Sequence, residues 1–88
     1  MNRLHREQDK KALILRLKRV EGQLRGLQRM IDEDAACESI AQQLSASRRA
    51  LDKAYHTMIG CLIEAQLTGK GVAQADLKPV VDMLLRYG

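Results

Sequence analysis

Apolar side chains recur at intervals of three and four residues along the first third of the chain. The stripe consists of Leu13, Leu17, Val20, Leu24, Leu27 and Ile31. This heptad spacing places every member on one face of an α-helix and is typical of a helix that packs lengthwise against another helix. It predicts one long helix over residues 6–31, which ends near the acidic run at residues 32–34.

A second apolar stripe with the same alternation follows almost at once. Its members are Cys37, Ile40, Leu44, Ser47, Leu51, Ala54, Met58, Cys61 and Ala65. Asp34 is suited to the N-cap of this helix, because its carboxylate can accept a hydrogen bond from the backbone N–H of Cys37 at the third helical position. Gly69, within residues 68–71, is suited to end the helix. We therefore expect a second long helix between these two points.

The last part of the chain predicts a short and nearly all-apolar third helix over residues 76–86. Asp76 can cap this helix, and Pro79 would lie in its first turn, where proline is tolerated. The two long helices, joined by a short connection, should form an antiparallel hairpin. No strand pattern is present. The predicted fold class is all-α, with a three-helix protomer of two long antiparallel helices and a short third.

The size of the chain limits the core that it can build alone. It has 88 residues, no Phe or Trp and only two Tyr, so we expect a single domain over residues 1–88 with few large apolar side chains. A lone hairpin leaves one side of both stripes in water. Two hairpins that pair into a four-helix bundle would bury that side. The stripes therefore predict a homo-oligomer, at least a dimer.

Positive charge is concentrated at one end of the chain. Residues 1–31 carry nine Lys and Arg against three acidic residues, residues 32–88 carry six against eight, and the net charge is +4. The strongly basic first segment suits a polyanionic partner, of which nucleic acid is the first to consider. A solvated basic face is the alternative that charge alone leaves open.

Several basic residues lie off the apolar stripes, where they could neutralise DNA phosphates. Arg16 and Arg19 share one face of the first helix, with Gln23 one turn further on. The predicted DNA-binding residues are Arg16, Lys18, Arg19, Arg48, Arg49 and Lys53. The sequence has no helix-turn-helix, zinc-finger or basic-zipper pattern, so we expect helix faces to make the contact.

Two cysteines, Cys37 and Cys61, lie on the stripe of the second helix. At about 1.5 Å per residue their separation is roughly 36 Å, so neither a disulfide nor a shared metal site can form within one chain. They could meet only across subunits, if second helices run antiparallel about a two-fold axis. The first turn of a helix favours a thiolate at Cys37. The alternative for both cysteines is a small apolar role in the packing stripe.

Other candidates for chemistry are few. His5 lies near the N-terminus, and His56 and Cys61 are on different faces of their helix. No His and Cys spacing is typical of a zinc site. The sequence has no Ser-His-Asp set and no phosphate-binding loop, so we do not expect an enzyme. No signal peptide or membrane-spanning stretch is visible, which predicts a cytoplasmic protein with no membrane partner.

A family resemblance is carried by three segments of the chain. They are residues 16–26 (RLKRVEGQLRG), 34–37 (DAAC) and 42–46 (QQLSA). These segments resemble the copper-sensing repressor (CsoR/RcnR) family of bacterial transcriptional repressors, over about the whole chain. The resemblance implies a four-helix-bundle dimer, a tetramer of two such dimers, and operator DNA that is released when a small inducer binds. It matches Arg16 and Lys53 to basic positions linked to DNA binding, and Cys37 to the sensing cysteine.

The chain departs from the sensing patterns of that family, whose members respond to copper(I), nickel or cobalt, formaldehyde or persulfides. The copper pattern has a His and a Cys where this chain has Leu62 and Gln66. The nickel and cobalt pattern includes an N-terminal His, which His5 matches, but its later histidines are missing here. The formaldehyde pattern has an N-terminal Pro and a His at the Leu62 position. The persulfide pattern places its second cysteine at the Gln66 position, whereas this chain has Cys61.

These observations favour a repressor that binds operator double-stranded DNA and is released when a thiol-reactive inducer modifies Cys37, with Cys61 of another subunit as its partner. A metal-sensing repressor of the same family is the alternative, in which a transition-metal ion binds Cys37 with His5 or Cys61. An alternative of another class is a coiled-coil interaction module without DNA binding. Such a module has no need of the basic first segment.

Overall fold

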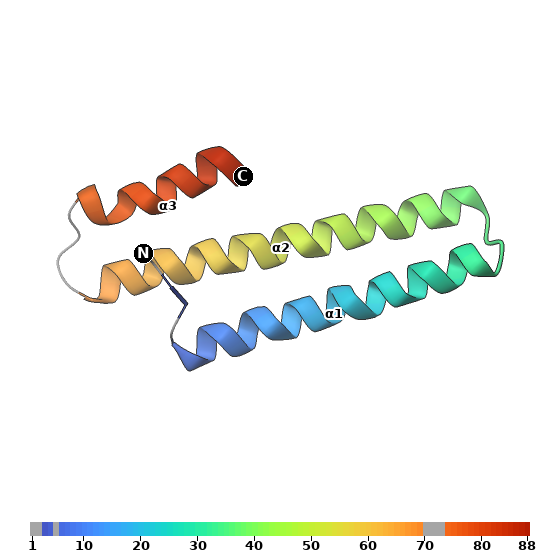
Figure 1. Ribbon diagram of the computed structural model, residues 1–88, viewed down its shortest axis with the longest axis horizontal. Helices are drawn as coiled ribbons and strands as arrows, with labels where there is room; N and C mark the ends of the chain where they lie inside the picture. The colour runs from blue at the N-terminus through green and yellow to red at the C-terminus, as the bar shows by residue number, and fades with distance from the viewer. Residues whose placement is uncertain (1–2, 5, 70–73) are drawn as a thin grey trace.

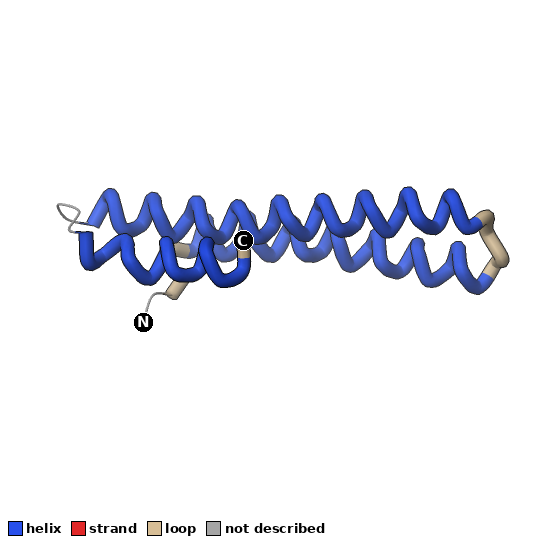
Figure 2. Tube along the Cα trace, turned by 90° about the horizontal axis from the view of Figure 1, so that it is seen from above, coloured by secondary structure: helices blue, strands red, loops and turns tan. Residues whose placement is uncertain are grey.

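The computed structural model is an elongated hairpin of two long helices, with a third helix beside one end (Figure 1). It describes residues 3–4, 6–69 and 74–88. The helices are α1 (Glu7–Asp32), α2 (Cys37–Gly69) and α3 (Gln74–Tyr87), and these described ranges contain no strand. Figure 2 shows α1 and α2 running side by side along most of the molecule. The predicted all-α fold with two long antiparallel helices and a short third is therefore confirmed.

The turn between α1 and α2 is built around Asp34, which has a φ of 58°. The Asp34 N–H donates to the Ile31 carbonyl at 3.2 Å, and the Ala35 N–H donates to the Met30 carbonyl at 2.9 Å. These two bonds form a Schellman motif, in which the residue after the C-cap adopts the left-handed conformation. Asp34 therefore ends α1, a role that aspartate tolerates better than most residues.

The prediction that Asp34 is the N-cap of α2 is therefore wrong. The helix begins at Cys37, and the Ile40 N–H donates to the Ala36 carbonyl at 3.1 Å. Ala36 is thus the capping residue, and Cys37 is the first helical residue instead of the third. The left-handed backbone that stops α1 at Asp34 delays the start of α2.

The third helix also begins earlier than predicted, at Gln74 instead of Asp76. Asp76 is therefore within the helix and does not cap it, and Pro79 lies in the second turn instead of the first. The predicted end of α2 at Gly69 agrees with the structure, whereas residues 70–71 of that predicted turn lie outside the described residues.

The two long helices pack through alternate members of the predicted stripes. Val20 and Leu27 of α1 are each 5% exposed, and Ser47 and Ala54 of α2 are 5% and 2% exposed. These four residues repeat at intervals of seven within each helix, so they form one line of contact. The small side chains of Ser47 and Ala54 allow the two helix backbones to approach closely. We call this line the seam.

Five leucine and isoleucine members of the stripes are exposed in a single protomer. They are Leu17, Leu24, Ile31, Leu44 and Leu51, between 43% and 54% exposed. We call this set the apolar flank. An exposed apolar surface of this length is a candidate for contact with another protein surface. The predicted stripes therefore divide into two sets: one set packs α1 against α2, and the other set is exposed on the surface of the protomer.

The third helix docks on the end of α2 through a small apolar core. Ile59 and Leu62 of α2 are buried and pack with Val80 of α3. The Tyr55 hydroxyl, from α2, donates a hydrogen bond to the Met83 carbonyl of α3 at 3.3 Å. Among the described residues, no helix is both long and apolar enough to span a membrane.

Candidate nucleic-acid interface and sensor thiols

A small basic pocket lies beside the seam, on the side away from the apolar flank. Arg16, Arg19 and Gln23 of α1 line it together with Ala50 and Lys53 of α2, around a volume of about 170 Å³. The first three residues share one helical face because they are three and four apart. Antiparallel packing brings this face against the part of α2 that carries Lys53. Three of the six predicted DNA-binding residues therefore meet at one place.

The positive charges of this pocket have no carboxylate partner among the residues that the structure describes. Within the described part of the chain, no ion pair involves Arg16, Arg19 or Lys53. Elsewhere on α1, by contrast, Arg25 lies 3.7 Å from Glu21. Three positive side chains that converge on one surface create a positive potential there, which attracts an anionic ligand.

The other three predicted DNA-binding residues are exposed but do not line the pocket. Arg49 lies one helical turn before Lys53 and donates a hydrogen bond to the Ser45 hydroxyl at 2.8 Å, so it extends the same side of α2. Arg48 is about 100° further around that helix, and Lys18 lies on a different face of α1 from Arg16. The predicted set thus divides into a convergent group and a dispersed group.

Gln23 belongs to the pocket but was not among the predicted DNA-binding residues. Its position four residues after Arg19 and seven after Arg16 was the available signal, since these spacings share a helix face. Gln23 carries no charge, so the positive charge that marked the other residues as candidates did not mark it. We call Arg16, Arg19, Gln23 and Lys53 the basic flank.

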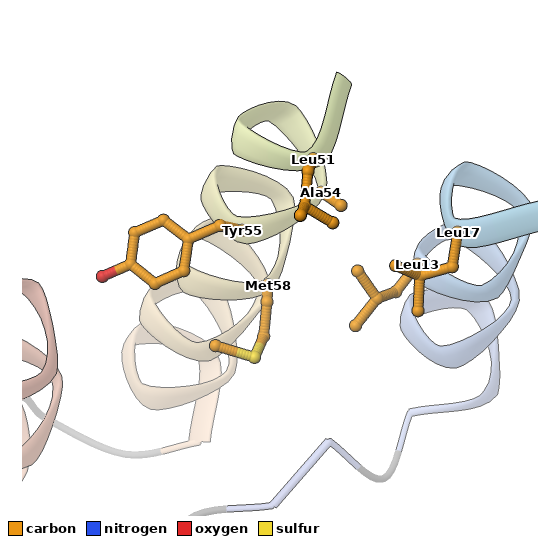
Figure 3. Close-up of a pocket in the computed structure, with 6 residues that line it drawn as sticks. All are labelled: Leu13, Leu17, Leu51, Ala54, Tyr55 and Met58. Carbon is orange, nitrogen blue, oxygen red and sulfur yellow. The ribbon is translucent and has the colours of Figure 1, made fainter. Parts of the chain in front are cut away.

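An apolar groove lies on the opposite side of the seam, with a volume of about 250 Å³ (Figure 3). It is lined by Leu13, Leu17, Leu51, Ala54, Tyr55 and Met58. Arg16 and Leu17 are consecutive, and the turn of about 100° per residue places them on either side of the stripe that contains Val20. The hairpin therefore has one charged side and one apolar side.

The two cysteines occupy different environments and are both free thiols. Cys37 is exposed at the start of α2, whereas Cys61 is half-buried in its second half. Both lie on the same uninterrupted helix, so their separation is roughly 36 Å at 1.5 Å per residue. The structure thus agrees with the prediction that the two cysteines of one chain cannot bind a common ligand.

The surroundings of Cys61 include a partly buried ion pair that sequence reasoning missed. Asp9 is only 7% exposed, and its carboxylate lies 2.7 Å from Nε of Arg6. A guanidinium nitrogen of Arg6 also lies 3.4 Å from Glu64, one turn from Cys61. Burial raises the pKa of the Cys61 thiol, and a hydrogen bond to Asp9 raises it further. Cys61 is therefore held as the neutral thiol at neutral pH.

The donor set for a metal ion is incomplete within one chain. Among the described residues, no three or more His, Cys, Asp and Glu side chains gather closely enough to hold a metal ion. Leu62, at the His position of the copper pattern, is buried in the core against α3. His5, the predicted partner of Cys37 in a metal site, lies outside the described residues. The described residues of one protomer thus do not fit a metal site, and Cys37 would need donors from another chain.

Comparison with known proteins gives a consistent result. The sequence model of one family, described as metal-sensitive transcriptional repressor, matches residues 9–86. The copper-sensing transcriptional repressor CsoR of Mycobacterium ulcerans is 38% identical over 72 residues, which are 76% of this chain and 62% of that protein. CsoR of Bacillus subtilis is 36% identical over 72 residues, 72% of this chain and 67% of that protein. The chain thus spans about two thirds or less of the length of these relatives.

A solved structure has a similar fold. It is a variant of the formaldehyde-responsive regulator FrmR from Salmonella enterica serovar Typhimurium, with a TM-score of 0.79. The match covers 96% of this chain and 99% of that chain at 24% sequence identity. At this level of identity the similarity establishes the shared helical fold.

We predict that the two thiols react at different rates with a small alkylating agent such as iodoacetamide. Cys37 is exposed, whereas Cys61 is half-buried and its raised pKa leaves less thiolate at neutral pH. Mass spectrometry of peptides from a time course should show Cys37 labelled first. In Asp9→Asn the pKa of Cys61 should fall and its labelling should accelerate. Equal rates at both cysteines in the wild-type protein would contradict this description of the Cys61 site.

Proposed function

Because the chain belongs to the metal-sensitive transcriptional repressor family, we propose that it represses transcription by binding operator DNA through its basic flank. The observation that carries this proposal is the convergence of Arg16, Arg19 and Lys53 at one pocket, where no described carboxylate pairs with them. Arg and Lys in such a position neutralise phosphates and release counterions from the duplex. Lys18, Arg48 and Arg49 would add further backbone contacts.

The proposed contact uses helix faces that run along the molecule. The hairpin extends 55 Å along its longest axis, so the basic flanks of several protomers could follow a considerable length of duplex. Contacts to phosphates position a protein on DNA, whereas base contacts specify the sequence. We therefore propose that much of the affinity is electrostatic and falls as salt increases. This function has no catalytic step and is proposed for the cytoplasm.

The apolar flank supports a homo-oligomer as the DNA-binding form. Leu17 and Leu24 of α1 and Leu51 of α2 leave about half of their surface in water in one protomer. Burying a leucine side chain fully is worth about 1.5–3 kcal/mol. Pairing of two apolar flanks as a four-helix bundle would remove this surface from water, and a tetramer would form from two such dimers. The basic flank would remain open because it faces the other side of the seam.

Cys37 is the proposed inducer-responsive residue, with Cys61 as an auxiliary thiol. The exposure of Cys37 at the first residue of α2 supports this ranking, as do the burial and raised pKa of Cys61. If second helices run antiparallel about a two-fold axis, Cys37 approaches the Cys61 end of the partner. A thiol-reactive inducer needs only the Cys37 thiol, whereas a metal ion needs further donor side chains that the described residues of one protomer do not gather. Because the relatives are copper-sensing repressors, copper(I) is tested beside the thiol-reactive inducers.

Release of DNA would follow from a change in helix packing. Modification of Cys37 between subunits would alter the angle of the paired hairpins, so the basic flanks would no longer match the spacing of the phosphates. An inducer that binds the DNA-free form about 100-fold more tightly lowers operator affinity by the same factor, about 2.7 kcal/mol. The coupling therefore requires two arrangements of the paired hairpins, with an equilibrium between them that both ligands influence.

The DNA-binding proposal predicts a change in salt dependence when Arg16 is replaced. Arg16→Ala should weaken binding to duplex DNA and lower the slope of log affinity against log salt by about one for each lost phosphate contact. Arg19→Ala and Lys53→Ala should behave in the same way. Fluorescence anisotropy over a series of salt concentrations measures the slope.

The matched control is Arg25→Ala, which makes the same change on α1 outside the pocket. Arg25 is exposed and already paired with Glu21, so its loss should alter the slope less than the loss of Arg16. An unchanged slope in Arg16→Ala would count strongly against the proposed interface. A wild-type protein that does not bind duplex DNA would instead favour an interaction module.

The oligomer proposal predicts that charge on the apolar flank separates the protomers. Leu24→Glu combined with Leu51→Glu removes two leucines from the interface, a loss of roughly 3 kcal/mol or more. The dissociation constant of the dimer should rise at least 100-fold or so. Sedimentation velocity at micromolar concentration measures the shift. Leu85→Glu is the control, because Leu85 lies outside the flank and is 82% exposed. A folded wild-type monomer at this concentration would rule the proposal out.

The sensing proposal predicts that Cys37→Ser abolishes release of operator DNA by the inducer, whereas Cys61→Ser weakens it. Copper(I), a persulfide and formaldehyde are tested in turn, with mass spectrometry of the exposed protein to identify the adduct. Each variant is checked for its oligomeric state. If Cys37→Ser remains oligomeric and still releases DNA normally, the assignment is wrong. If Cys61→Ser alone abolishes the response, the ranking of the two cysteines is reversed.

A further inference from the structure

We propose that the basic pocket is a discrete site for one tetrahedral oxyanion of the phosphate class, and that Gln23 is the neutral donor that makes it selective. This inference rests on the proposed function for its source of phosphate, the DNA backbone. It goes further in assigning a saturable site that also binds a free oxyanion without DNA.

The shape and charge of the pocket suit a compact anion. Its volume of about 170 Å³ exceeds that of a single phosphate or sulfate group but cannot enclose a nucleotide pair. Arg16, Arg19 and Lys53 approach it from two helices, so their positive charges converge. Guanidinium groups bind phosphate oxygens through two parallel N–H donors, whereas an ammonium group acts as a point charge. A tetrahedral anion can satisfy all three at once.

The Gln23 amide distinguishes this pocket from a merely basic surface. Its oxygen is buried and has no hydrogen-bond partner among the described residues, although the side chain lines the pocket. The buried oxygen cannot touch a ligand in the pocket. The NH₂ end of the amide is not among the buried atoms that lack a partner, and its two N–H donors would complete the coordination of an oxyanion.

The pocket also depends on the packing of the hairpin. Ala50 forms part of its lining, and the seam residues Val20 and Ala54 hold α1 and α2 together beside it. A donor set held by two packed helices presents a fixed geometry, which loose surface lysines do not. We therefore expect sulfate and phosphate to bind more tightly than chloride at equal ionic strength, and to compete with duplex DNA.

The test follows the side-chain N–H signals of Gln23, Arg16 and Arg19 by nuclear magnetic resonance during titration of the DNA-free protein. Sodium sulfate and inorganic phosphate should shift these signals saturably, whereas sodium chloride at matched ionic strength should not. Gln23→Glu places a carboxylate in the pocket and should weaken sulfate binding at least tenfold. It should also weaken binding to duplex DNA by about tenfold at fixed ionic strength.

The matched control is Gln28→Glu, which makes the same chemical change at an exposed position of α1 outside the pocket. It carries the same net charge as Gln23→Glu, so any difference between the two variants reports the pocket and not the long-range field. Gln23→Leu removes the amide without adding charge and should also weaken sulfate binding at least tenfold. It provides the test if circular dichroism shows that Gln23→Glu has lost helicity.

The outcomes separate this inference from the proposed function. Equal, non-saturating shifts with sulfate and chloride would overturn the oxyanion site, even if Arg16→Ala still weakened DNA binding and left the proposed function intact. Equal effects of Gln23→Glu and Gln28→Glu would overturn the role of Gln23. Saturable sulfate binding that Gln23→Glu abolishes would support the site. If DNA affinity then stayed unchanged in both Gln23→Glu and Arg16→Ala, free oxyanion would be the ligand and the proposed DNA interface would fail.

Discussion

The close packing of α1 against α2 along one heptad position is the constraint on which the rest of the molecule depends. Val20 and Leu27 are buried against a line of α2 that includes Ser47 and Ala54. Because two of these residues are small, the helices meet directly and neither can rotate without losing buried contacts. The seam therefore determines which residues of each helix lie on either side of it, and so it determines the composition of both the basic flank and the apolar flank.

The two flanks consequently belong to one rigid unit. A contact that rotates or tilts α1 through Leu17 must also move Arg16, since the two residues are consecutive on the same helix. In the proposed repressor, this arrangement connects the subunit interface to the DNA interface without a separate transmitting element. Coupling of this kind needs a two-state element that both ligands influence. The pairing of two hairpins is the natural candidate.

The two thiols differ because the two ends of α2 differ. Cys37 follows a tight turn in which Asp34 carries the positive φ, and it is exposed there. Cys61 lies where the start of α1 contacts α2, beside Asp9 and the Arg6 ion pair. Burial and a neighbouring carboxylate both disfavour the thiolate. The same apolar stripe of α2 therefore carries an exposed candidate for reaction, Cys37, at one end and a protected thiol, Cys61, towards the other.

The sequence by itself determined the three helices, the hairpin and the two stripes, because local periodicity records which face of a helix is apolar. It also identified the basic residues and showed that the two cysteines are too far apart to pair within a chain. Only the tertiary structure decided which stripe members form the seam, that Asp34 ends α1 instead of starting α2, and that Gln23 joins Arg16 and Lys53 in one pocket. Those features depend on the register and rotation of one helix against another, and these are set by side-chain packing across the seam, which periodicity along a single helix does not encode.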